Sequence, residues 1–266
     1  MHPEYRWLSR DAPLLAASGA LLVTAHYLSV TRPLVPPGGL DLDDVSWSID
    51  RSVIGSVSVR ADRHSDYFRL AALAYPAFLA PLSQPAGARF RESLRRSLEY
   101  VEAITLAEGL GHVLKNTFDR PRPYTYLPGA ERPTNASYDV LAEEAFRSMP
   151  SGHAVGAFVG ASFAMTDHLL TRPDASWQER VAVSSFGGFL AGMTATLRVR
   201  AGQHFPSDAV VGGLIGTASG VLVPLVHDYV GPEGRKVAGP PSRAWWQAIA
   251  AELGGIGLGV LAAQLY

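Results

Sequence analysis

The stretch AVVGGLIGTASGVLVPLVHDYV, residues 209–230, decides the fold class of this chain. Its apolar residues follow one another almost without interruption until the last turn. A helix needs about 20 mostly apolar residues to cross the hydrocarbon core of a bilayer, and this stretch comes close to that length. The sequence therefore predicts a long apolar helix here, of a length that spans a membrane.

Six further segments are predicted to be long apolar helices, at residues 12–30, 68–82, 98–114, 153–170, 181–197 and 245–266. The first and last of these also approach spanning length. Residues 68–82 are short for a span and contain Pro76, and residues 98–114 carry Glu99, Glu102 and Glu108. We therefore expect an all-α, polytopic membrane bundle of about six to seven helices. The mean hydropathy of +0.09 is low for such a protein, so a soluble helical bundle stays open.

Composition excludes several classes of function. Lys and Arg number 23 against 24 Asp and Glu, so the basic excess of a nucleic-acid binder is missing and we expect no nucleic-acid partner. Without cysteine, a disulfide framework and a cysteine-based metal site are both impossible. We see no domain boundary, and we treat residues 1–266 as a single domain.

Three polar clusters interrupt the apolar blocks: KNTFDRPRP at 115–123, PSGH at 150–153 and RVRAGQHFPSD at 198–208. Together they supply three cations and two imidazoles, with a carboxylate four residues after the second imidazole: Lys115, Arg122, Arg198, His153, His204 and Asp208. Guanidinium groups match phosphate oxygens with a planar fork, and imidazoles exchange protons near neutral pH. None of the clusters has a convincing metal-ligand pattern, so the set predicts an anion site without a metal or other cofactor.

Local sequence supports this anion site. Ser151 precedes an apolar run and is suited to cap that helix, so the backbone N–H groups of Gly152 and His153 lie in its first turn. Such helix starts bind anions, and Gly152 lets a phosphate come close to the backbone. Pro206 and Asp208 suit the first turn of the next apolar helix.

Chain direction brings the clusters together. Successive helices with short connections alternate in direction. The end of the predicted helix at residues 98–114, the start of 153–170, the end of 181–197 and the start of 209–230 therefore lie on one side. These ends carry Lys115, His153, Arg198, His204 and Asp208. We therefore expect an active site at one end of a four-helix core.

The three clusters resemble the signature of the type 2 phosphatidic acid phosphatase superfamily, K-x6-RP, PSGH and SR-x5-H-x3-D, in its lipid phosphatase or bacterial membrane phosphatase branch. Every specified position between Lys115 and Asp208 agrees except one, because Leu197 stands where the pattern has Ser. That difference puts an auxiliary phosphate contact in doubt.

The resemblance implies a mechanism and residue roles. His204 would attack phosphorus as the nucleophile, and Asp208 would orient it. His153 would protonate the leaving oxygen and then activate water to hydrolyse the phosphohistidine. The phosphoryl oxygens would be bound by Lys115, Arg122, Ser151, Gly152 and Arg198. We place Arg120 and Arg200 at the surface or against a lipid headgroup.

The substrate expected from this resemblance is a lipid phosphate monoester or pyrophosphate. Three alternatives stay open: a soluble secreted acid phosphatase with the same clusters, a vanadate-dependent haloperoxidase with the same anion cage, and a binding protein that has lost catalysis. Haloperoxidases usually have a longer gap between the Lys and the Arg-Pro, and both histidines and the Asp are present here, so a phosphatase is favoured.

Charge in the loops predicts the orientation in the membrane. Arg89, Arg91, Arg95 and Arg96 cluster between the second and third blocks against one acid, Glu92. Positively charged short loops stay in the cytoplasm, so the catalytic clusters should face the other side. We expect an integral membrane protein, in the inner membrane of a bacterium, with its active site toward the periplasm or exterior.

Overall fold

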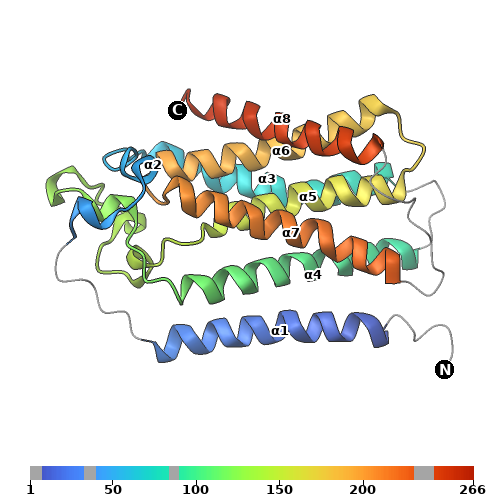
Figure 1. Ribbon diagram of the computed structural model, residues 1–266, viewed down its shortest axis with the longest axis horizontal. Helices are drawn as coiled ribbons and strands as arrows, with labels where there is room; N and C mark the ends of the chain where they lie inside the picture. Colours follow the sequence, from blue (N-terminus) through green and yellow to red (C-terminus); the bar gives the residue numbers. More distant parts are fainter. Residues whose placement is uncertain (1–7, 33–39, 84–89, 231–242) are drawn as a thin grey trace.

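The computed structural model describes residues 8–32, 40–83, 90–230 and 243–266, and within these ranges the protein is all-α, with eight α-helices and no strand (Figure 1). The seven predicted helices are all present: α1 (Leu8–Thr31), α3 (Val59–Ser83), α4 (Phe90–Lys115), α5 (Gly152–Thr171), α6 (Trp177–Arg200), α7 (Pro206–Val230) and α8 (Arg243–Ala263). The short α2 (Ser48–Arg51) and several 3₁₀ turns lie in the connections.

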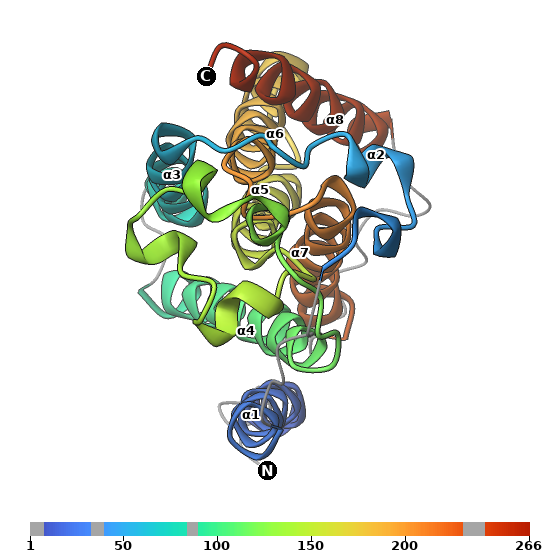
Figure 2. The same cartoon turned by 90° about the vertical axis from the view of Figure 1, so that its left-hand side faces the viewer.

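The helices form a bundle in which α5 packs against α3, α4, α6 and α7. Helix α8 lies outside α6, and α1 lies outside α4, away from the other helices (Figure 2). Successive helices from α3 to α8 alternate in direction, as expected, although the connection between α4 and α5 is long (Figure 1). The segments 40–58 and 116–151 gather at the end where α4 and α6 finish and α5 and α7 begin, so this end is covered by ordered loops.

Glycines let pairs of helices approach closely. A Cβ on Gly255 of α8 would lie 2.0 Å from the carbonyl oxygen of Ser185 in α6, and one on Gly188 of α6 would lie 2.1 Å from that of Glu252. Gly192 and Gly259 follow four residues later in each helix, with equally tight contacts. This small-xxx-small spacing on both helices is the packing device of membrane helix pairs.

The same device joins α5 to α7 and thereby builds the site. A Cβ on Gly212 would lie 2.5 Å from the carbonyl oxygen of Ser151, and one on Gly216 would lie 2.4 Å from that of Val155. Because the two helix starts approach so closely, the backbone N–H of Ser151 donates to the carbonyl oxygen of Asp208 at 3.0 Å. The second and third sequence clusters are therefore in direct contact.

The second apolar block is longer than hydropathy indicates. We expected residues 68–82, but α3 begins at Val59 because the polar residues before Phe68 continue the helix. Asp62 and Ser65 in this first part are buried. Acidic residues in α4 also have partners within the bundle, since Glu99 pairs with Arg96 at 3.0 Å and Glu102 contacts His227 at 2.8 Å. Hydropathy does not register such pairing.

Much of the lateral surface of the bundle is apolar. In the described ranges two helical segments, Pro206–Asp228 and Arg243–Ala263, are long and apolar enough to cross a membrane. Large apolar side chains are exposed on these two helices, with examples at Leu214, Leu222, Leu258 and Leu261. Others are exposed on the remaining long helices, with examples at Leu22, Val23, Leu70, Phe78, Leu98, Val101 and Phe186. Exposed apolar surface of this extent marks a contact with lipid or protein, and with the two apolar helices it suggests association with a membrane.

Candidate active site

The three cations of the sequence motifs are all buried and each has a carboxylate partner. Lys115 ends α4, and its Nζ lies 3.0 Å from Glu144 Oε2. The Nη2 atom of Arg122 lies 2.9 Å from the same oxygen. Arg198, near the end of α6, donates to Asp62 Oδ1 at 2.5 Å. We refer to Lys115, Arg122 and Arg198 as the cage. The carboxylates of Glu144 and Asp62 offset the repulsion between its positive charges.

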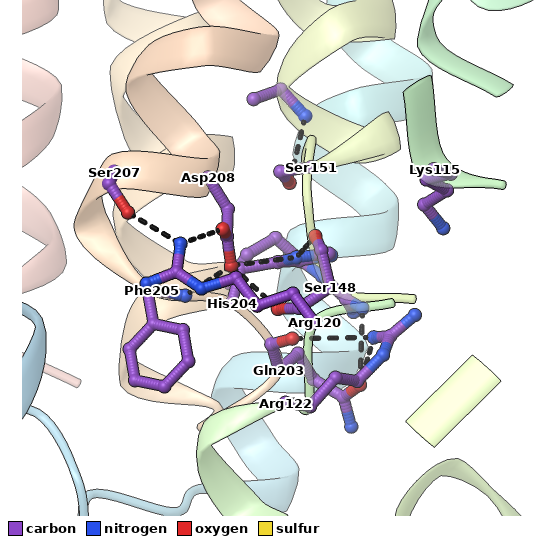
Figure 3. Close-up of polar contacts among 12 residues, drawn as sticks. Lys115, Arg120, Arg122, Ser148, Ser151, Gln203, His204, Phe205, Ser207 and Asp208 are labelled. Carbon is purple, nitrogen blue, oxygen red and sulfur yellow. Dashed lines mark hydrogen bonds and ion pairs between the residues drawn. The ribbon is translucent and has the colours of Figure 1, made fainter. Parts of the chain in front are cut away.

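Gln203 connects two of these cations. Its side-chain oxygen accepts from Arg122 Nη1 at 2.5 Å and from Arg198 Nη2 at 3.4 Å (Figure 3). Gln203 follows Gly202, whose φ of +70° ends helix α6 in the left-handed region that favours glycine. A Cβ there would also lie 2.7 Å from the carbonyl oxygen of Ser56. This turn fixes Gln203 and the next residue, His204.

His204 is buried, with a defined tautomer. Its Nδ1 lies 2.8 Å from the carbonyl oxygen of Ser148, and a carbonyl only accepts, so Nδ1 donates. In the neutral imidazole the lone pair then lies on Nε2. Burial lowers the pKa of His204 well below its usual range, and Arg122, Arg198 and Lys115 lower it further. The arrangement keeps a neutral, nucleophilic nitrogen beside three cations.

Asp208 does not hold His204 by a direct hydrogen bond. Asp208 Oδ2 lies 3.8 Å from His204 Nδ1, and instead accepts from Ser148 Oγ at 2.6 Å and from the Phe205 backbone N–H at 2.8 Å. Ser148 thus receives the Asp208 contact at its hydroxyl and the His204 contact at its carbonyl (Figure 3). Asp208 is thus linked to the imidazole only indirectly, through Ser148 and the backbone of the turn.

Arg120, expected at the surface or against a headgroup, instead reaches into this network. Its Nη1 donates to Asp208 Oδ1 at 2.5 Å (Figure 3). Its Nη2 donates to Asp50 Oδ2 at 2.7 Å. Asp50 is buried in α2 and also accepts from the hydroxyl of Ser207 at 2.6 Å. The segment around α2 is thereby tied to the start of α7.

The PSGH cluster lies at the start of α5, as expected. Ser151 caps this helix, because its Oγ accepts from the N–H of Ala154 at 3.4 Å. A Cβ added to Gly152 would have no protein atom within 4 Å, so the backbone is open to an anion at this point. His153 Nε2 lies 2.7 Å from Asp66 Oδ1 of α3. Besides burial, the positive charges of Arg198 and Arg122 act on His153, so this residue lies at the same site.

The structure thus places all eight predicted site residues at one end of α4, α5, α6 and α7. Leu197, where the signature has Ser, is fully buried against Met193, Ala201 and Ala263 and makes no polar contact. Within the described ranges, no group of three or more His, Asp or Glu side chains is arranged to hold a metal ion.

Sequence reasoning missed several residues of the site: Asp50, Asp62, Asp66, Glu144, Ser148 and Gln203. The two acids of α3 had a signal, because Asp62, Ser65, Asp66 and Arg69 recur at helical spacing and share one face. Asp62, Ser65 and Asp66 nevertheless lie before the predicted helix at residues 68–82, whose limits follow apolar length alone. The others lie in the short α2, in a 3₁₀ turn or in loops. In such segments the spacing of residues in the sequence does not predict which side chains come together.

Comparison with known proteins agrees with the motifs. A family model described as PAP2 superfamily matches residues 96–232, which is just over half of the chain and includes every predicted site residue. No curated protein and no solved structure matches the chain.

Proposed function

Because the chain belongs to the PAP2 superfamily, and is therefore a phosphatase, we propose that it hydrolyses a lipid phosphate monoester or pyrophosphate through a phosphohistidine on His204, without a metal ion. The observation that supports this most strongly is the convergence of Lys115, Arg122, Arg198 and both motif histidines, from separate segments, on one end of the bundle. We propose that residues 1–266 act as one phosphatase domain.

The first step of the proposed reaction forms a bond from Nε2 of His204 to phosphorus. The bond between phosphorus and the leaving oxygen breaks, and that oxygen takes a proton from His153. Phosphoryl transfer needs chiefly positioning and neutralisation of charge, which the three cations and the Gly152 and His153 N–H groups supply. Asp208, acting through Ser148, keeps the His204 ring in place as charge develops on it.

The second step returns the enzyme to its starting state. His153, now neutral, removes a proton from water, and the hydroxide attacks phosphorus as the bond to His204 breaks. The electron pair returns to Nε2 and inorganic phosphate leaves. A positioned general acid or base of this kind contributes about 10²–10⁴-fold to a rate.

A lipid substrate is supported by the surface of the bundle. Exposed apolar side chains lie on the lateral surfaces of α1, α4, α7 and α8, where they are suited to contact acyl chains. The glycine contacts of α6 with α8 are of the membrane type. A soluble secreted phosphatase would keep such side chains inside. We propose that the protein is integral to a membrane, the inner membrane in a bacterium, with the site at the bilayer surface.

The test is phosphate release in detergent from phosphatidic acid, phosphatidylglycerol phosphate, polyprenyl pyrophosphate and lipid A phosphates, with EDTA present. We expect at least one to be hydrolysed by the wild type, with inhibition by vanadate and loss of activity in His204→Ala. His26→Ala, an exposed histidine of α1, is the matched control and should keep full activity. Activity that magnesium restores after EDTA, or that survives His204→Ala, would contradict the proposal.

A further inference from the structure

Asp66 lies outside the three motifs but contacts a residue of the second one. Its Oδ1 is 2.7 Å from His153 Nε2. Because a carboxylate oxygen accepts hydrogen bonds, Nε2 is protonated and donates a hydrogen bond to Asp66. In the described part of the chain, Nδ1 of His153 has no hydrogen-bond partner. With Nε2–H held in this way, Nδ1 carries a proton only when the ring is an imidazolium.

The surroundings of His153 oppose that imidazolium. Burial disfavours the charged ring most strongly, and the positive charges of Arg198 of α6, Arg69 of α3 and Arg122 of the 116–151 segment disfavour it further. Each of these arginines already has a carboxylate partner: Arg69 pairs with Glu108 at 3.1 Å, Arg198 with Asp62 at 2.5 Å and Arg122 with Glu144 at 2.9 Å. Asp66 is the acid that contacts His153 itself, and a nearby opposite charge favours the charged form of a titrating group.

We propose that Asp66 is a positioning residue for the general acid: its carboxylate holds the His153 ring and stabilises the imidazolium, so that Nδ1 gives its proton to the departing oxygen of the substrate. This inference rests on the proposed function. As Nδ1 loses the proton, the phosphorus–oxygen bond breaks and the oxygen leaves as a neutral alcohol or phosphate. His153 is then neutral, with Nε2–H still donated to Asp66, and Nδ1 is ready to accept a proton from water.

The helix supports this role through its geometry. Asp66 follows Asp62 by four residues on α3, so the two carboxylates lie on one face and serve two neighbouring groups, His153 and Arg198. The Asp66 side chain is 62% exposed, whereas His153 is 21% exposed, so replacing Asp66 by Asn removes charge from the rim without opening the core.

The experiment compares two substrates that differ in their need for an acid. A simple alkyl phosphate has a poor leaving group, whereas p-nitrophenyl phosphate has a good one that departs without protonation. In Asp66→Asn, kcat/KM for the alkyl phosphate should fall about 10- to 100-fold, at most the lower limit of the roughly 10²–10⁴-fold that a general acid contributes, because His153 itself is kept. The kcat/KM for p-nitrophenyl phosphate should be affected far less. The basic limb of the kcat/KM profile for the alkyl phosphate should move down by about one pH unit, because the imidazolium loses its stabilising charge.

Asp62→Asn is the matched control, one turn earlier on the same helix. It removes the partner of Arg198, a residue proposed to bind phosphate, so it should reduce kcat/KM for both substrates to a similar extent. Asp66→Glu, which keeps the charge, should restore part of the activity toward the alkyl phosphate. All three variants are made in the full chain in detergent, and their melting temperatures are compared with that of the wild type.

The outcomes separate this inference from the proposed function. Equal losses on both substrates in Asp66→Asn, or an unmoved basic limb, would overturn the role of Asp66 while leaving the phosphohistidine mechanism intact. Survival of activity in His204→Ala would instead overturn the mechanism on which the role depends. A selective loss on the alkyl phosphate, with a lowered basic limb, would support Asp66 as the partner of the acid.

Discussion

The carboxylate of Glu144 lies 3.0 Å from the ammonium nitrogen of Lys115. The same oxygen is 2.9 Å from Arg122 Nη2, so it bridges two cations that we propose bind phosphoryl oxygens. Burial alone would raise the pKa of Glu144, but Lys115 and Arg122 outweigh it and the pKa is lowered, so this carboxylate stays ionised. Glu144 therefore competes with the substrate for the cage.

Replacing Glu144 by Gln should strengthen anion binding. Because the Glu144 side chain is 58% exposed, its pairs are screened and contribute at most about 1 kcal/mol, which corresponds to about fivefold in affinity. We expect the inhibition constant of vanadate to fall by about that factor. Glu143→Gln is the control, since Glu143 pairs with Arg147 at 3.0 Å outside the cage, and should leave the constant unchanged. Weaker vanadate inhibition in Glu144→Gln would mean that the carboxylate supports binding.

The acidic limb of the pH–rate profile should lie below the usual histidine range. Burial and the charges of Arg122, Arg198 and Lys115 lower the pKa of His204, so its reactive neutral form persists as the pH falls through 6.5, the usual value. Arg122→Gln removes one of these charges, so the limb should move to higher pH, and kcat/KM should fall as well. A profile of kcat/KM between about pH 4 and pH 7 measures both. A limb already at 6.5 in the wild type would contradict the lowered pKa.

Substitution of Gly255 should loosen α8 from α6. Its Cβ would lie 2.0 Å from the carbonyl oxygen of Ser185, which is backbone and cannot yield easily. We expect Gly255→Ala to destabilise the protein by about 1–3 kcal/mol, seen as a lower melting temperature in detergent. Gly257→Ala, two residues along the same helix, would meet no atom within 4 Å and should melt at or slightly above the wild-type temperature. Equal melting temperatures for the two variants would argue against the close contact.

Labelling of single cysteines tests the orientation in the membrane. The chain has no cysteine, so Ser137→Cys near the site and Asp174→Cys in the short connection between α5 and α6 each introduce one thiol. Both positions are exposed, and they lie at opposite ends of the bundle. Arginines gather at the Asp174 end, so we place that end in the cytoplasm. An impermeant maleimide should label intact cells at position 137 and spare position 174; the reverse pattern would invert the topology.

The fold class, the seven long helices and the end of the bundle at which the motif residues lie could all be predicted from the sequence alone. The physical reason is that the length of an apolar segment is read directly from consecutive residues, as at 209–230, and predicts a long helix. The alternation of successive helices then predicts which helix ends lie together. The family could also be identified from the spacings between Lys115 and Asp208, and residues 96–232 match it.

The hydrogen bonds and ion pairs between the polar groups of the site could be seen only in the tertiary structure. Asp66 reaches His153 because α3 begins a full two turns before its apolar part. Charged residues at the start of a helix cannot be told from a loop by hydropathy, because hydropathy does not show their partners. The carbonyl oxygen of Ser148, rather than Asp208, accepts the hydrogen bond from His204 Nδ1, because the backbone of the 116–151 segment folds back onto the start of α7. Contacts of this kind join residues far apart in the chain, and they depend on how glycines such as Gly212 bring α5 and α7 together, which no local pattern records.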